Sequence, residues 1–106
     1  MTRANQIDET TSPVVTGLYI KVALPGSSSL KEKRGRLLRI INGIRQRFNV
    51  SVAEIGFNDN WQTSIIGCAI LSNSARYNLE VAENILKTIE SCFPDEPVEN
   101  YQIEAR

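Results

Sequence analysis

The chain has 106 residues, of which 42% are hydrophobic, and its twelve basic and twelve acidic side chains leave no formal net charge. This size and composition predict one soluble globular domain with a single core. The chain has no histidine and no CxxC pattern, so it lacks the usual zinc ligands and the usual general acid–base residue. No apolar run approaches the roughly 20 residues that cross a bilayer.

The first 13 residues are polar and end in Ser-Pro, which predicts a flexible arm (1–13) before a single domain (14–106). This segment has no apolar core of the kind found in signal peptides, so we expect a cytoplasmic protein with no membrane association. Cys68 and Cys92 lie in apolar stretches, where buried and reduced thiols are expected.

A β-branched run over residues 14–24 predicts a central strand that ends at Pro25 and Gly26. One of the serines at 27–29 is expected to cap a helix over about 30–48. At 100° per residue the apolar stripe of this helix comprises Leu30, Leu37, Leu38, Ile41, Ile44 and Phe48. Four bases are expected to point away from that stripe, namely Lys33, Arg36, Arg39 and Arg47. Arg34 is expected to project within it.

The remaining segments predict strands at 50–57 and 62–72, a helix over about 75–93 and a final strand over "VENYQIEA". Two βαβ units with right-handed crossovers then pack as a four-stranded antiparallel sheet with both helices on one face. The predicted fold is an α+β ferredoxin-like sandwich with strand order 4-1-3-2. Such a scaffold serves many functions and implies none by itself.

The neutral total charge conceals a strong asymmetry along the chain. Residues 31–47 contain seven bases and one acid, whereas residues 80–106 contain seven acids and two bases. Cations at a helix start are disfavoured by roughly 0.3–1 kcal/mol each. A phosphate bound at the helix start would reverse that penalty. The candidate anion or nucleic-acid ligands are Lys31, Lys33, Arg34, Arg36, Arg39 and Arg47, with the turn Gly26, Ser27, Ser28 and Ser29.

Two alternatives stay open for this helix. It can be a solvated face, with or without pairing to the acids of the second helix, or a phosphate-binding face. Arg34 has two interpretations of its own: its guanidinium either extends past the sheet to water or faces whatever the 25–29 turn binds.

The second candidate surface is the sheet face away from the helices. Strand 62–72 is apolar on both faces, and an uncovered apolar sheet would be an unusually large exposed patch. We therefore expect a homodimer through this face, or cover from the N-terminal arm, with Val15, Tyr19 and Trp61 as candidate interface residues. Tyr19 is the single aromatic that the two central strands offer, so base stacking on the sheet is not predicted.

No sequence pattern of an enzyme is recognisable. "PGSSSLKEK" precedes a helix but is not GxxxxGK[ST], and its serines have no histidine base. The acylphosphatases share this fold class and bind phosphate in the same loop, but their arginine-bearing pattern is absent. We predict no catalytic residues, no cofactor and no metal site.

The segments "LPGSSSLKEKR", "RFNVSVAEI", "DNWQ" and "ILSN" occur here in the order typical of the YlxP-like family of small bacterial proteins. The resemblance covers about residues 15–92. In that family the serine turn often carries a further base where this chain has Ser28, and strand 1 often carries a histidine where it has Ala23.

The resemblance implies a ferredoxin-like fold and a ribosomal setting, because the family's genes frequently neighbour those for translation initiation factor two and ribosome-binding factor A. Ribosomal RNA, or the small ribosomal subunit, is then the expected partner. The sequence thus predicts a small non-catalytic RNA- or ribosome-associated binding protein. The alternative is a homodimeric protein-interaction module without a nucleic-acid role.

Overall fold

The computed structural model describes residues 12–105, so most of the predicted N-terminal arm lies outside the described residues. Its six elements follow the predicted order: β1 (Val14–Ala23), α1 (Leu30–Arg47), β2 (Ser51–Gly56), β3 (Thr63–Ser72), α2 (Ala75–Cys92) and β4 (Val98–Ala105). The sheet order is β2-β3-β1-β4, and every neighbouring pair is antiparallel. The predicted ferredoxin-like fold and its strand order are confirmed.

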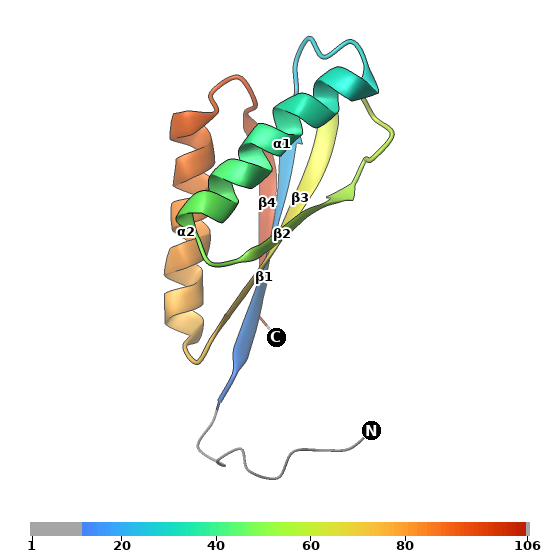
Figure 1. Ribbon diagram of the computed structural model, residues 1–106. Coiled ribbons are helices and arrows are strands. Elements are labelled where there is room, and N and C mark those ends of the chain that lie inside the picture. Colours follow the sequence, from blue (N-terminus) through green and yellow to red (C-terminus); the bar gives the residue numbers. More distant parts are fainter. Residues whose placement is uncertain (1–11, 106) are drawn as a thin grey trace.

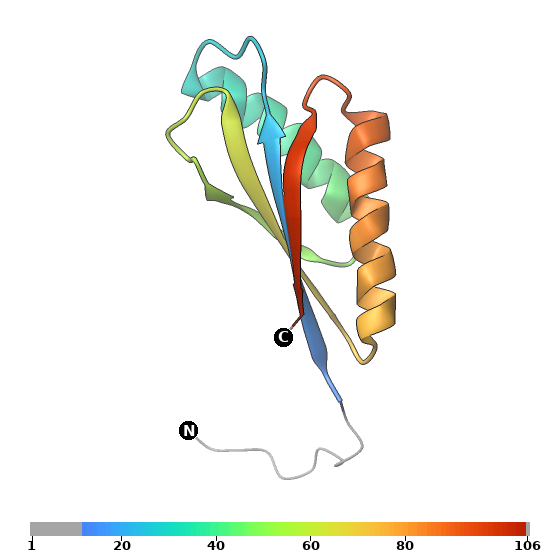
Figure 2. The ribbon, with the colours of Figure 1, turned by 180° about the vertical axis from the view of Figure 1, so that it is seen from behind.

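Both helices cover the same face of the sheet (Figure 1). Helix α1 crosses the strands diagonally, while α2 runs along the edge next to β4. Seen from behind, the opposite face carries no helix in the described chain (Figure 2). No helix within residues 12–105 combines the length and hydropathy needed to span a membrane.

The core forms between the helices and the inner face of the sheet. Alternate residues of β1 point inward, and Leu18, Ile20 and Val22 are fully buried. Burying each such side chain contributes about 1.5–3 kcal/mol relative to leaving it exposed. The other members lie in the connection after β1 and in α1, β2, β3 and α2: Leu24, Leu37, Ile40, Ile44, Val52, Ile66, Cys68, Ile70, Ala82, Ile85, Leu86 and Ile89.

Helix α1 buries a different stripe from the one that its apolar residues predict. Its buried residues are Lys33, Leu37, Ile40 and Ile44, whereas Leu38 is half exposed. These positions follow helical spacing, so the whole helix is rotated toward Lys33 and Ile40 relative to the expected stripe. The expected outward orientation of Lys33 and inward orientation of Arg34 are therefore both wrong.

The two thiols lie in different surroundings. Cys68 is buried on β3, and burial raises the pKa of its thiol to about 12, which keeps it protonated and unreactive. Cys92, at the end of α2, is exposed. The prediction of a buried thiol is wrong at Cys92, because the side chains that face the core at this end of α2 are Ile89 and Phe93.

Candidate nucleic-acid interface

The first turn of α1 carries its own anion. Ser29 is the N-cap, and its hydroxyl accepts a hydrogen bond from Glu32 N at 3.0 Å. Ser28 donates to Glu32 Oε2 from its backbone N–H (2.6 Å) and its hydroxyl (3.0 Å), and these bonds, the backbone one first, lower the pKa of Glu32. The Glu32 carboxylate thereby offsets the unfavourable cations at this helix start.

The rest of the serine turn is already engaged. Gly26 adopts a left-handed conformation (φ 76°), which a glycine tolerates without strain. Ser27 is buried, and its hydroxyl donates to Ser29 O at 3.4 Å. Since Ser28 is bonded to Glu32, all three serines of the turn make hydrogen bonds within the protein, and their hydroxyls are not free to bind an anion in this structure.

Lys33 is a buried structural cation. Only 1% of it is exposed, and its Nζ lies 2.9 Å from Glu54 Oε2 on β2 and also donates to Phe57 O. The same carboxylate oxygen accepts a hydrogen bond from Ser64 Oγ on β3 at 2.6 Å. Lys33 joins α1 to the β2–β3 hairpin and cannot reach a ligand from solvent.

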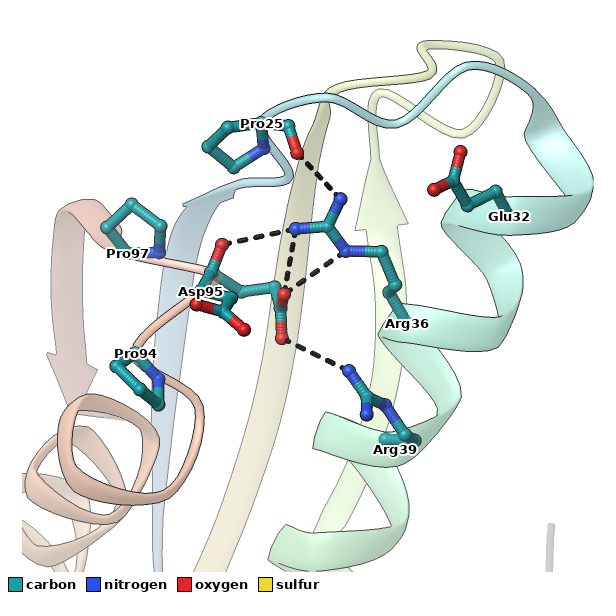
Figure 3. A pocket seen from close by; sticks show the side chains of 8 residues that line it. Pro25, Glu32, Arg36, Arg39, Pro94, Asp95 and Pro97 are labelled. Carbon is teal, nitrogen blue, oxygen red and sulfur yellow. Dashed lines mark hydrogen bonds and ion pairs between the residues drawn. The ribbon is translucent and has the colours of Figure 1, made fainter.

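The guanidinium of Arg36 is also bound to other groups of the protein (Figure 3). Its Nε and Nη2 donate to Glu96 Oε2 at 3.1 and 2.8 Å, and its remaining contacts are Nη1 to Pro25 O and Nη2 to Asp95 O. Glu96 is only 2% exposed. This fork connects α1 with the β1–α1 and α2–β4 connections, so the expected outward orientation of Arg36 is wrong as well.

Figure 3 shows the cleft that surrounds this fork, about 590 Å³ in volume. Three prolines form part of its wall, and Arg39 reaches toward it with Nη2 3.8 Å from Glu96 Oε1. Arg39 remains 65% exposed and keeps most of its donors for solvent or a ligand. Its contact with Glu96 is long at 3.8 Å and joins an exposed arginine to a buried carboxylate.

The other bases of α1 face solvent. Arg34 is exposed, because its neighbour Lys33 takes the inward position. Arg45, which sequence reasoning missed, is exposed too and donates to Val52 O at 3.0 Å. The sequence does contain a signal for Arg45: it follows Arg34 by eleven residues, and residues eleven apart lie on the same face of a helix. The exposed bases, here called the basic surface, are Lys31, Arg34, Arg39, Arg45 and Arg47.

Few acids neutralise the basic surface. Glu32 is the one acid in the sequence of α1, and it is held against Ser28. Within residues 12–105 no ion pair joins α1 to α2, whose Glu80 lies 3.8 Å from Arg76 of the same helix. The acids that α1 contacts are Glu54 and Glu96, which lie outside α2. The pairing of α1 with the acids of the second helix is therefore wrong, and a solvated face and a phosphate-binding face remain the two alternatives for its exposed bases.

The open face of the sheet is largely apolar over β1, β2 and β3. Tyr19 lies over Gly17, where an added Cβ would come within 2.6 Å of the tyrosine hydroxyl, and Ile55 lies over Gly67 in the same way. A shallow hollow of about 270 Å³ opens between these side chains. The exposed apolar side chains of this face include Val15, Ile55 and Leu71.

Trp61 lies away from the middle of that face, in the β2–β3 connection, and is 51% exposed.

Within residues 12–105 no group of three or more histidine, cysteine or acidic side chains is arranged to hold a metal ion. The candidate interface thus consists of the basic surface on one side of the molecule and the apolar sheet face on the other.

Residues 15–102 match a family described as "Protein of unknown function (DUF503)". The uncharacterized protein YlxP of Bacillus subtilis (strain 168) is 41% identical over 69 residues, which span 65% of this chain and 74% of that protein. The de novo designed protein Foldit4 aligns with 90% of this chain and 97% of its own at a TM-score of 0.51 and 14% identity. This last likeness concerns the fold alone.

Proposed function

The chain belongs to the DUF503 family of proteins of unknown function, and from the surface of α1 we propose that it is a small, non-catalytic RNA- or ribosome-associated binding protein. The basic surface contacts the phosphate backbone. Such contacts position a protein on RNA without reading its sequence. Specificity then comes from RNA shape or from a neighbouring protein.

The observation that carries this proposal is the division of the seven bases of α1. Lys33 and Arg36 are used in the fold, which leaves five exposed bases on one helix. Among the residues that the structure describes, Arg39 is the one of these five with a carboxylate partner, at 3.8 Å. Maintaining so many exposed like charges on one helix costs self-repulsion, which a polyanion relieves. The ribosomal partner rests on the resemblance to YlxP-like proteins and on their gene neighbourhood.

The non-catalytic part of the proposal rests on the side chains available. The sequence has no histidine, and the buried thiol of Cys68 stays protonated. The carboxylate that accepts from the Ser28 hydroxyl, Glu32, has a lowered pKa, which makes it a weak general base.

The test is co-sedimentation with purified small ribosomal subunits over a salt series. In the variant Lys31→Glu/Arg34→Glu we expect binding to be lost, because two phosphate contacts become repulsive. The variant should fold normally, since both residues are exposed and acids are favoured near a helix start.

The matched control is Arg76→Glu/Lys87→Glu, which makes the same change of net charge on α2. This control should bind as the natural protein does. Equal loss of binding in both variants would mean that net charge, and not the position of the bases on α1, determines binding. Absence of binding by the natural protein at low salt would contradict the ribosomal proposal.

The apolar sheet face favours a second function, in which two copies pair through it as a protein-interaction module. Leu71 is 67% exposed on this face, far above what a core strand residue shows, and Val15 is its partner in the β1–β3 register. The polar segment 1–11 offers few apolar side chains to cover such a surface.

This second function predicts a concentration-dependent dimer that Leu71→Glu disrupts. Light scattering after size exclusion measures the mass, and Leu79→Glu on the outside of α2 is the control, since Leu79 is also exposed. A natural protein that elutes as a monomer at every concentration would rule out this dimer.

A further inference from the structure

Two large aromatic side chains are exposed in the connection between β2 and β3. Phe57 is 48% exposed and Trp61 is 51% exposed, and they lie four residues apart around a tight turn. Phe57 also has a left-handed backbone (φ 56°), which is unfavourable for a bulky side chain and common for glycine or asparagine. Neither core packing nor turn geometry explains an aromatic residue at this position.

The turn is firmly held. Phe57 O accepts hydrogen bonds from Asn60 N at 3.0 Å and from the buried Lys33 ammonium. Asn60 Oδ1 accepts from Gln62 N at 2.9 Å, and the Gln62 amide donates to Ser27 O at 3.3 Å. The two rings are therefore presented from a rigid connection, so little conformational entropy is lost when they bind a ligand.

The basic surface begins beside this turn. The contact between Lys33 and Phe57 fixes the turn against the start of α1, and both ribbon views place the β2–β3 connection next to the first turns of that helix (Figures 1 and 2). Arg34 and Lys31 are both exposed in the first two turns of α1, and helical spacing puts Arg34 on the same flank as Arg45, which donates to Val52 O of β2. On the sheet side, Lys21 Nζ lies 5.5 Å from the centre of the Phe57 ring.

Exposed aromatic rings next to a track of cations are the two components of single-strand recognition. The rings stack on unpaired bases, while the cations follow the phosphates. A duplex keeps its bases stacked on one another and offers only its backbone. Deepening the proposed function, on which this inference rests, we infer that Phe57 and Trp61 stack on unpaired bases of an RNA whose phosphates lie along Lys31 and Arg34.

The test compares a single-stranded oligoribonucleotide with the same strand annealed to its complement. Trp61 is the single tryptophan of the chain, so its fluorescence reports stacking directly. We expect the single strand to quench Trp61 and the duplex to leave it unchanged. Phe57→Leu and Trp61→Leu should each weaken single-strand binding about tenfold, because one stacked base is lost.

The matched control is Tyr101→Leu, which removes an equally exposed aromatic (54%) from the far edge strand β4 and should leave binding unchanged. If both RNAs bind with equal affinity through Lys31 and Arg34 and the leucine variants match the natural protein, the stacking inference is overturned and the proposed function stands. If neither RNA binds, both are overturned, and the aromatic turn then belongs to a protein contact.

Discussion

Arg36→Ala is expected to lower the free energy of unfolding by about 3–5 kcal/mol, because it leaves the buried Glu96 carboxylate without its main partner. Glu96 is 2% exposed, and its remaining cation, Arg39, lies 3.8 Å away. The substitution also removes the donors to Pro25 O and Asp95 O, so two connections lose their link to α1. Urea unfolding followed by circular dichroism measures the change.

Two further variants separate this effect from a general loss of charge. Arg39→Ala removes a largely exposed arginine and should cost about 1 kcal/mol or less. The double variant Arg36→Met/Glu96→Met should be more stable than Arg36→Ala, because no uncompensated charge stays buried. Equal stability of Arg36→Ala and Arg39→Ala would contradict the structural role given to this fork.

Lys33→Met is expected to cost about 2–4 kcal/mol, toward the lower part of the range for breaking a buried pair, since Glu54 keeps 18% exposure and the Ser64 hydroxyl. Methionine retains most of the aliphatic stem, so the loss comes from the ammonium and not from packing. Phe57 O keeps its bond from Asn60 N. Thermal and urea unfolding should agree on the size of the loss.

The neighbouring exposed base gives the comparison. Arg34→Met should change stability by no more than about 0.5 kcal/mol, as is usual for surface positions. Lys33→Met/Glu54→Gln should recover part of the loss, because the buried carboxylate is then neutral. If Lys33→Met and Arg34→Met change the free energy of unfolding by the same amount, Lys33 is not the buried cation described above.

The fold was predictable because each element shows its pattern locally. The alternation of β1, Pro25 and Gly26 at its end and the serine caps of both helices all agree with the final arrangement. The right-handed βαβ rule then fixes the order of the strands. What remained open was the rotation of each helix about its own axis.

That rotation decides which bases are available. A lysine is polar, so the helical pattern predicts that Lys33 faces solvent. Its aliphatic stem nevertheless packs in the core, because Glu54 and Phe57 O bind the ammonium group. On α2 the sequence predicts an apolar stripe of Leu79, Ala82, Ile85, Leu86, Ile89 and Phe93. Leu79 is instead exposed, and its neighbour Asn78 is buried, where it donates to Val14 O, Thr16 Oγ1 and Ile70 O. Such partners lie far away in sequence, and spacing along one helix cannot reveal them.

The salt dependence of RNA binding tests most directly whether the bases of α1 divide into structural and ligand-binding sets. For a single-stranded RNA, neutralising Lys31, Arg34 and Arg45 as Gln should make the slope of log K against log salt shallower by roughly two, at about 0.7 per lost phosphate contact. Lys33→Met, measured where it is folded, should keep the slope of the natural protein. Equal slopes for the natural protein and the triple variant, or a slope changed by Lys33→Met alone, would contradict this division.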